Sequence, residues 1–526
     1  MHSRLKLGVL PAELHQQLLN LTTNMKSSSA DVAERVSVDA PFTGEVIGEV
    51  LVGDAQDVSR AFQLSRGAQK LWAEMPMSER KRIFLKFHDL VLKNRELLMD
   101  FVQLETGKNR ASAADEVLDV AITTRYYANK AEKFLSDKKH PGALPIVTKN
   151  MQQHVPKGVV GQITPWNYPL TLGISDAVPA LLAGNGVVAK PDLATPFSCL
   201  IMVHLLIEAG LPAELMQVVT GSGEVVGGEI AKQCDFLMFT GSTATGRILG
   251  RQMGERLVGF SAELGGKNPL IVSKDADLDK VIADLPHACF SNSGQLCVSI
   301  ERIYVEEEVY DEVVTRFVEA VKAMPLGAGF DWKYAMGSLI SETHVARVSQ
   351  FVEQARAEGA NVLCGGKARA DLGPYFYEPT VLVDVAEHTA LRTEEVFGPV
   401  VFVEKVASLE QAIEKANATS YGLNASVFAA SDTGNWVARR LRAGAVGIND
   451  GYAATWASVS TPSGGMKQSG LGRRHGAEGI LKYTEIKNVA EQRWISMRGP
   501  AKIPRKVYSD TAATALKLGK MFKILP

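Results

Sequence analysis

The spacing of apolar residues divides the chain into regions of different periodicity. Between residues 55 and 135, apolar side chains recur at intervals of three and four among charged ones, as at Phe84, Phe87 and Val91. This spacing predicts several amphipathic helices. From residue 159 onward, short runs rich in β-branched residues alternate with helical segments. That alternation predicts an α/β fold in which helices cover parallel sheets.

The alternating pattern forms two successive blocks, which predict two lobes. In the first block we expect helices and strands at 159–164, 186–190, 196–209, 216–220, 223–234, 236–240 and 269–272. In the second, from 301 to about 449, we expect them at 302–305, 309–324, 361–363, 381–383, 400–403 and 446–449.

Four segments lie outside these blocks. Residues 10–21 predict a short amphipathic helix, and the polar stretch 25–29 is expected to be mobile. Segments 137–156 and 482–494 fit two alternatives equally: strands that reach another subunit, or a surface hairpin and a terminal strand. Residues 499–526 mix basic and apolar side chains. A solvated tail packed on its own protein is favoured there over a basic amphipathic helix that touches anionic lipid or another subunit.

Composition narrows the classes of function. The 526 residues carry 57 basic and 58 acidic side chains, a formal charge of −1, which argues against nucleic-acid binding. Neither a long apolar run nor a leader peptide is visible, so a cytoplasmic location is expected. The five cysteines are scattered singly, which argues against a disulfide framework and against a metal site; they are Cys199, Cys234, Cys289, Cys297 and Cys364.

Four motifs place one reactive side chain among rigid turn residues. They are Thr-Pro-Trp-Asn-Tyr-Pro at 164–169, Phe-Thr-Gly-Ser-Thr-Ala-Thr-Gly at 239–246, Glu-Leu-Gly-Gly-Lys at 263–267, and Phe-Ser-Asn-Ser-Gly-Gln-Leu-Cys at 290–297. Each alone has an ordinary alternative, because a lone cysteine is usually a buried hydrophobe and an asparagine beside proline usually caps a turn. Together, in this order, they closely resemble the aldehyde dehydrogenase superfamily. The likeness runs from about residue 36 to 489 and includes Lys190-Pro191, 394–399, 421–423 and 464–470.

This resemblance implies a particular architecture: two Rossmann-type parallel-sheet domains and a small β oligomerisation domain in a dimer or tetramer. The expected division of the chain is a terminal helix and tail (1–30), a dinucleotide-binding domain (31–137 and 157–265), a catalytic domain (266–475), oligomerisation strands (138–156 and 476–495) and a basic tail (496–526).

The resemblance also implies a mechanism. Cys297 is the expected nucleophile, which forms first a thiohemiacetal and then a thioester with an aldehyde. The amide of Asn167 and the backbone N–H of Cys297 are the expected donors to the oxyanion. Glu263, in an apolar and close-packed setting, is the expected base for hydrolysis of the thioester.

Residues that hold the cofactor follow from the same likeness. Two glycine turns are candidates, and the family places the pyrophosphate on the second, so Gly241 and Ser242 are assigned to it and Gly221 to a turn near the adenine. Further expected contacts are Trp166, Lys190, Glu395 and Phe397. NAD-preferring relatives commonly carry a glutamate three residues after the lysine, where this chain has Leu193. We therefore expect NADP to be preferred, with NAD also accepted.

The motifs determine the substrate less firmly than they determine the reaction. The motifs look most like the bacterial succinate-semialdehyde dehydrogenases, yet two arginines that hold the distal carboxylate in such enzymes are replaced by Ser175 and Ser291. Arg302 is the nearest cation in sequence, but a structural role is favoured for it. The residues expected to line the substrate tunnel are Leu170, Ser291, Leu296, Val298 and Ser463, with Trp166 and the loop at 452–463.

Three alternatives to oxidation of succinate semialdehyde stay open. One is a dehydrogenase of broad specificity for aliphatic and aromatic aldehydes. Another is an acylating enzyme that passes the acyl group to coenzyme A, although Glu263 argues against it. The third is a non-catalytic structural paralogue, which the joint retention of Cys297, Asn167 and Glu263 disfavours.

Overall fold

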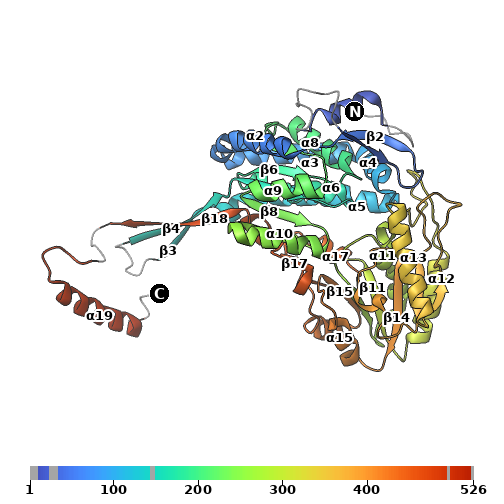
Figure 1. The fold of residues 1–526 in the computed structure, drawn as a ribbon. Coiled ribbons are helices and arrows are strands. Elements are labelled where there is room, and N and C mark those ends of the chain that lie inside the picture. The colour runs from blue at the N-terminus through green and yellow to red at the C-terminus, as the bar shows by residue number, and fades with distance from the viewer. Residues whose placement is uncertain (1–9, 23–33, 142–147, 494–497, 523–526) are drawn as a thin grey trace.

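A computed structural model describes residues 10–22, 34–141, 148–493 and 498–522. Two α/β lobes and a projecting arm make up the molecule, with both lobes built on mainly parallel sheets (Figure 1). The expected α/β class with two parallel-sheet lobes is confirmed. The expected mobile stretch at 25–29 lies outside the described residues.

The first lobe contains a six-stranded sheet in the order β17-β9-β8-β5-β6-β7. Its strands are β5 (Val159–Ile163), β6 (Gly186–Lys190), β7 (Met216–Val218), β8 (Phe236–Thr240), β9 (Gly259–Glu263) and β17 (Gly470–Leu471). Only β17 is antiparallel to its neighbour. The pattern did not predict β9, because its sequence, Gly-Phe-Ser-Ala-Glu, has no apolar run.

Helices from the first half of the chain cover this sheet. They are α2 (Ala55–Glu74), α3 (Met77–Lys93), α4 (Arg95–Thr106), α5 (Arg110–Leu135), α6 (Pro169–Ile174), α7 (Ala177–Leu182), α8 (Pro196–Ala209), η2 (Gly223–Gly227), α9 (Gly228–Gln233) and α10 (Thr243–Arg256). A hairpin of β1 (Arg35–Asp39) and β2 (Val46–Leu51) precedes them. The predicted terminal helix is α1 (Ala12–Leu19), which buries Leu18 and Leu19 in the core of this lobe.

The second lobe contains a seven-stranded sheet in the order β12-β13-β14-β11-β10-β15-β16. Its strands are β10 (Asn268–Val272), β11 (Ile300–Glu306), β12 (Asn361–Cys364), β13 (Thr380–Val383), β14 (Val400–Val406), β15 (Asn424–Phe428) and β16 (Ala445–Ile448). The buried β15 pairs with β10 and was not predicted. Surrounding helices are α11 (Leu278–Phe290), η3 (Ser291–Gly294), α12 (Tyr310–Lys322), α13 (Glu342–Ala357), α14 (Ala390–Thr393), α15 (Leu409–Asn417), α16 (Ser431–Ala438), α17 (Ala453–Trp456) and η4 (Lys467–Ser469).

The arm joins the two segments that fitted neither block. The strands β3 (Lys138–Pro141), β4 (Thr148–Pro156) and β18 (Thr484–Gln492) form one antiparallel sheet that extends away from the lobes (Figure 1). Thr484 pairs with Pro156 at its base. The short helix α18 (Glu478–Leu481) precedes β18.

Beyond the arm, α19 (Arg505–Phe522) stands apart from both lobes (Figure 1). Its exposed apolar side chains include Val507, Leu516 and Leu518. The expectation of a tail packed on its own protein is therefore wrong, because the arm carries this helix away from any surface of the described lobes. No helix within the described ranges is both long enough and apolar enough to cross a membrane.

Candidate active site

Three residues predicted to act in catalysis meet at one cavity of about 80 Å³ between the lobes. Asn167 lies in the loop between β5 and α6, and Glu263 ends β9. Cys297 lies between η3 and β11 and is half-buried. All three line the cavity, although 130 residues separate the first from the last.

A strained turn presents Cys297. Asn292, Ser293 and Gly294 adopt positive φ angles of 49°, 57° and 71°, in the left-handed region that costs energy for residues other than glycine. A Cβ on Gly294 would lie 2.2 Å from the carbonyl oxygen of Gly398, so only glycine fits there. Past the turn, the Asn268 side-chain amide donates to the Cys297 carbonyl at 2.8 Å. These contacts hold the sulfur-bearing residue at the cavity.

The electrostatic surroundings keep Cys297 protonated at rest. Burial raises the pKa of its thiol to about 12, and the nearby Glu395 and Glu263 add to that rise. Arg474 and the residue's own backbone N–H oppose it. Since the thiolate is the nucleophilic form, reaction at Cys297 requires a group that takes its proton.

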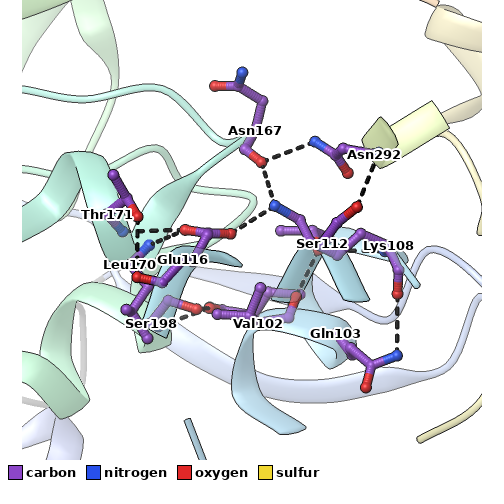
Figure 2. A network of polar contacts seen from close by, with 12 residues as sticks. Val102, Gln103, Lys108, Ser112, Glu116, Asn167, Leu170, Thr171, Ser198 and Asn292 are labelled. Atoms are coloured by element: carbon purple, nitrogen blue, oxygen red, sulfur yellow. Dashed lines mark hydrogen bonds and ion pairs between the residues drawn. The ribbon is translucent and has the colours of Figure 1, made fainter. Parts of the chain in front are cut away.

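Asn167 is anchored through its backbone. Its carbonyl oxygen accepts from Lys108 Nζ at 2.7 Å and from Asn292 Nδ2 at 3.0 Å, while its side-chain amide points away from this network (Figure 2). That amide donates one hydrogen to the Gln295 carbonyl at 3.0 Å. An amide nitrogen carries two hydrogens, so a second donor is left for a ligand in the cavity.

Beneath Asn167 lies a fully buried ion pair that sequence reasoning missed. Lys108 Nζ is 2.5 Å from Glu116 Oε1, and Glu116 Oε2 accepts from the backbone N–H groups of Leu170 and Thr171 at 3.0 Å each (Figure 2). The pair thus fixes the start of α6 and the Asn167 loop to α5. No sequence signal separates Lys108 from the other lysines, because its partners are eight to more than fifty positions away.

Substitution of Lys108 by Met should destabilise the protein by about 3–5 kcal/mol, because it leaves the Glu116 carboxylate buried without its cation. Denaturant-induced unfolding measures this change. Lys280→Met, which removes an exposed cation 3.1 Å from Asp277, is the matched control and should leave the midpoint unchanged. Equal midpoints for the two variants would contradict a structural role for the buried pair.

Glu263 also lines the cavity. Its carboxyl is buried, and within the described residues Oε1 has no hydrogen-bond partner. Burial raises the pKa of Glu263 to about 7, against the opposing effects of Arg474 and Lys482. A carboxyl with such a pKa can accept a proton near neutral pH.

A second group that sequence reasoning missed is Arg474, which lines the cavity beside Glu263. Its guanidinium pairs with Asp176, at 3.3 Å from Nε to Oδ1 and 3.2 Å from Nη2 to Oδ2. Lys482 Nζ lies 3.6 Å from the same Asp176 Oδ1. The motif at 464–470 ends just before Arg474, so only the folded chain shows where this side chain goes.

An aromatic cluster lies near the residues expected to contact the nicotinamide. Trp166 packs edge-on against Phe397 and His344, each with ring centroids 5.6 Å away. Phe397 adopts a φ of +60°, and its backbone N–H donates to Glu301 at 3.1 Å. Glu395 Oε1 accepts from the Gly266 N–H at 2.7 Å, which places its carboxylate over the turn that follows Glu263.

The residues expected around the rest of the dinucleotide lie at the carboxyl ends of β6, β7 and β8. Lys190 Nζ is buried and, among the described residues, has one hydrogen bond, to the Pro191 carbonyl at 3.0 Å, which leaves donors for a hydroxyl or anionic partner. Gly221 packs closely against Gly53 in a turn. Ser242 caps α10, whose N-terminus suits an anion. The N–H of Gly241 donates to the Glu263 carbonyl at 3.1 Å, so donors to a pyrophosphate must come from later residues.

Only part of the predicted substrate tunnel is found. Leu296, Val298 and Ser463 line the cavity, together with Tyr452 and Trp456 of the expected loop. Leu170, Ser291 and Trp166 do not line it. Leu170 is buried in the core, and Leu172 lines the cavity in its place. The Ser291 hydroxyl donates to the His287 carbonyl at 2.8 Å.

Neither Ser175 nor Arg302 offers a free group to a substrate. The Ser175 hydroxyl donates to Asp119 Oδ2 at 2.7 Å. Arg302 is buried and donates to the carbonyls of Lys267, Lys415 and Ala416 at 2.9–3.0 Å, the structural role that was favoured for it. A second cavity of about 210 Å³ shares Asp119, Tyr168, Tyr452 and Trp456 with the first and is also lined by Asp115.

Comparison with known proteins agrees with this geometry. A sequence model of the "Aldehyde dehydrogenase family" matches residues 27–489. A protein of Mycolicibacterium smegmatis named "Putative succinate-semialdehyde dehydrogenase", with NADP(+) in its name, is 51% identical over 93% of this chain and 95% of its own.

Two solved structures have the same fold. The crystal structure of an Escherichia coli NADP-dependent enzyme superposes with a TM-score of 0.86 at 35% identity, covering 90% of this chain and 99% of that one. An NAD+ complex of a Bacillus cereus aldehyde dehydrogenase superposes with a TM-score of 0.85 at 35% identity, covering 93% and 100%. The chain therefore belongs to the aldehyde dehydrogenase family and is an oxidoreductase that acts on aldehydes.

Proposed function

We propose that this chain oxidises an aldehyde to a carboxylate through a covalent intermediate on Cys297, with NADP as the hydride acceptor. The observation that carries the proposal is the meeting of Cys297, Glu263 and Asn167 at one cavity, next to the aromatic cluster of Trp166 and Phe397. Two features fit a dinucleotide: the buried Lys190 ammonium, which has one hydrogen bond among the described residues, and the start of α10, which Ser242 caps. When bound there, the nicotinamide ring accepts a hydride.

The first half of the reaction forms a thioester. The Cys297 thiol gives up its proton to solvent as its sulfur adds to the aldehyde carbon, and the resulting alkoxide accepts hydrogen bonds from the Asn167 amide and the Cys297 backbone N–H. Such preorganised donors in a site shielded from water stabilise developing negative charge. Loss of hydride from the former carbonyl carbon then leaves an acyl group on the sulfur.

Hydrolysis completes the cycle. Glu263 removes a proton from water as that water attacks the thioester, and this proton then passes to the departing Cys297 sulfur. The acid product loses its own proton to solvent and leaves as the carboxylate. A base with a pKa of about 7 is well matched to this step. Water is the acyl acceptor in this scheme, so NADPH formation should not depend on coenzyme A.

NADP specificity is proposed from the end of β6. Relatives with NADP(+) in their names share about half of this sequence, and Leu193 offers no carboxylate to repel a 2′-phosphate. Lys190 is placed to pair with that phosphate.

Substitution of Leu193 by Glu should therefore lower kcat/KM for NADP relative to NAD by about tenfold to a hundredfold, through charge repulsion at the 2′-phosphate. Steady-state kinetics with both cofactors measures the ratio. Leu193→Gln, which has a similar shape without the charge, should change the ratio far less. An unchanged ratio in the Glu variant would show that the phosphate lies elsewhere.

The substrate we propose first is succinate semialdehyde, which appears in the names of the mycobacterial relatives. The Ser463 hydroxyl in the cavity lining supplies a hydrogen-bond donor for its distal carboxylate, and the positive charge of Arg474 lies in the same lining. A second candidate is a neutral aliphatic or aromatic aldehyde, because Asp115 and Asp119 line the outer cavity among aromatic rings. Assays with succinate semialdehyde, propanal, octanal and benzaldehyde separate the two: the highest kcat/KM should be for the semialdehyde.

We further propose a homo-oligomer, a dimer or tetramer, with the arm reaching a second subunit. Ile248 and Leu257 at α10 and Leu471 on β17 are more than half exposed beside a groove of about 470 Å³, an apolar surface that a second copy would cover. Sedimentation of the full chain tests this.

From the likeness to the aldehyde dehydrogenase family, we also propose that residues 31–137 and 157–265 bind the dinucleotide and that residues 266–475 form the catalytic domain.

A further inference from the structure

The charged groups that surround Glu263 come from three separate segments. Arg474 and Arg473 lie on the loop after β17, Asp176 precedes α7, and Lys482 follows α18. Two further titratable groups, Cys297 and Tyr483, also interact with the Glu263 carboxyl. The balance among these groups decides whether that carboxyl is ionised.

Strand pairing brings Arg474 to Glu263. Gly470 of β17 lies opposite Glu263 on β9, so the loop that follows β17 passes beside the carboxyl. On its other side, Arg474 exchanges two backbone hydrogen bonds with Ser463, at 2.7 and 2.9 Å. Both side chains then line the same cavity. The backbone therefore fixes the Cα of Arg474 near the base, and the side-chain contacts decide where the guanidinium lies.

The guanidinium is nevertheless turned toward another carboxylate. Two of its nitrogens pair with Asp176, whose side chain is 4% exposed. In the part of the chain that the structure describes, Glu263 forms no ion pair and keeps a buried Oε1 without a partner. Lys482, the second cation, is likewise drawn to Asp176 and to Ser261, which shares a face of β9 with Glu263.

We infer that Asp176 and Arg474 are positioning residues for the base: Asp176 holds the guanidinium close to Glu263 but prevents it from closing into an ion pair with the carboxylate. A direct Glu263–Arg474 pair would hold the base ionised and engaged, unable to take a proton from water. With the cation absent, the buried carboxyl would be protonated at neutral pH. The inference rests on the proposed role of Glu263 and does not depend on the identity of the aldehyde.

Opposite changes at the two partners should shift the pH dependence in opposite directions. Arg474→Gln removes the cation, so the pH at which the deacylation rate rises should increase by about one unit. Asp176→Asn removes a negative neighbour and frees the guanidinium, so the rise should move down by a similar amount. A residue that served only to hold the fold would lower the rate without moving the profile in a charge-dependent direction.

Deacylation can be measured without cofactor or aldehyde. In the full-length protein, p-nitrophenyl acetate acylates Cys297 with a burst of nitrophenolate, and the following steady-state rate between pH 5.5 and 9 reports hydrolysis of the acyl group. Arg474→Lys, which keeps the cation, should restore a profile near that of the wild type. The matched neighbour Arg473→Gln, whose influence on the pKa of Glu263 is weaker than that of Arg474, should move it less.

The outcomes distinguish this inference from the proposed function. Normal deacylation in Glu263→Gln would overturn Glu263 as the base. If that variant is blocked but Arg474→Gln and Asp176→Asn shift the profile in the same direction or not at all, the positioning role is overturned. An Arg473→Gln shift as large as that of Arg474→Gln would also overturn it. Thermal unfolding of each variant identifies those that fail to fold, and Arg474→Lys then provides the folded comparison.

Discussion

Replacement of Cys297 by Ala should abolish NADPH formation from every aldehyde, with a loss of at least about 10⁴-fold in kcat, because Cys297 carries the one thiol among the described residues that line the cavity. Binding of NADP should survive, since Lys190, Ser242 and Glu395 are untouched. Fluorescence titration with NADP and a turnover assay measure the two properties separately.

A matched control is available in Cys289, eight residues earlier. This thiol is buried in the core of the second lobe, and burial raises its pKa far above the ordinary range. Cys289→Ser should retain most of the activity and should not prevent alkylation of Cys297. If Cys297→Ala kept measurable turnover, or if an acyl group were trapped on a different cysteine, the proposed mechanism would be wrong.

The second large effect is expected at Glu263. Its replacement by Gln should leave the first turnover intact, so that about one NADPH forms per site, and then slow the steady state by about 10²–10⁴-fold because the thioester loses its base. Rapid-mixing absorbance measures the burst, and mass spectrometry of the quenched protein should find the acyl group on Cys297. Loss of the burst itself would instead place Glu263 in the acylation step.

The pH dependence of the wild type follows from the pKa of Glu263, about 7. The carboxylate is the basic form, so the deacylation rate should be low below pH 7, rise through that value and level off above it. In Glu263→Gln this rise should disappear. Hydrolysis that rises at the same pH in both proteins would point to another titrating group.

Local patterns were sufficient for most of the fold. Strands such as β6 and β8 are continuous apolar runs bounded by turn residues, and α8 begins at a proline and ends at a glycine, so neighbours in sequence determine them. By contrast, β9 and β15 hold small and polar residues and become strands because adjacent strands pair with them. Their partners lie far away in the sequence, where periodicity has no information.

The sequence by itself determined the family, the α/β fold and the residues proposed for the chemistry, because each of these is encoded in short motifs of turn and reactive residues. Only the tertiary structure decided the setting of those residues. Lys108 under Asn167, Asp176 against Arg474, and the displacement of Leu170 and Ser291 from the cavity all depend on contacts between distant segments. Protonation and donor geometry follow from burial and from charges brought together across the fold, which no local pattern encodes.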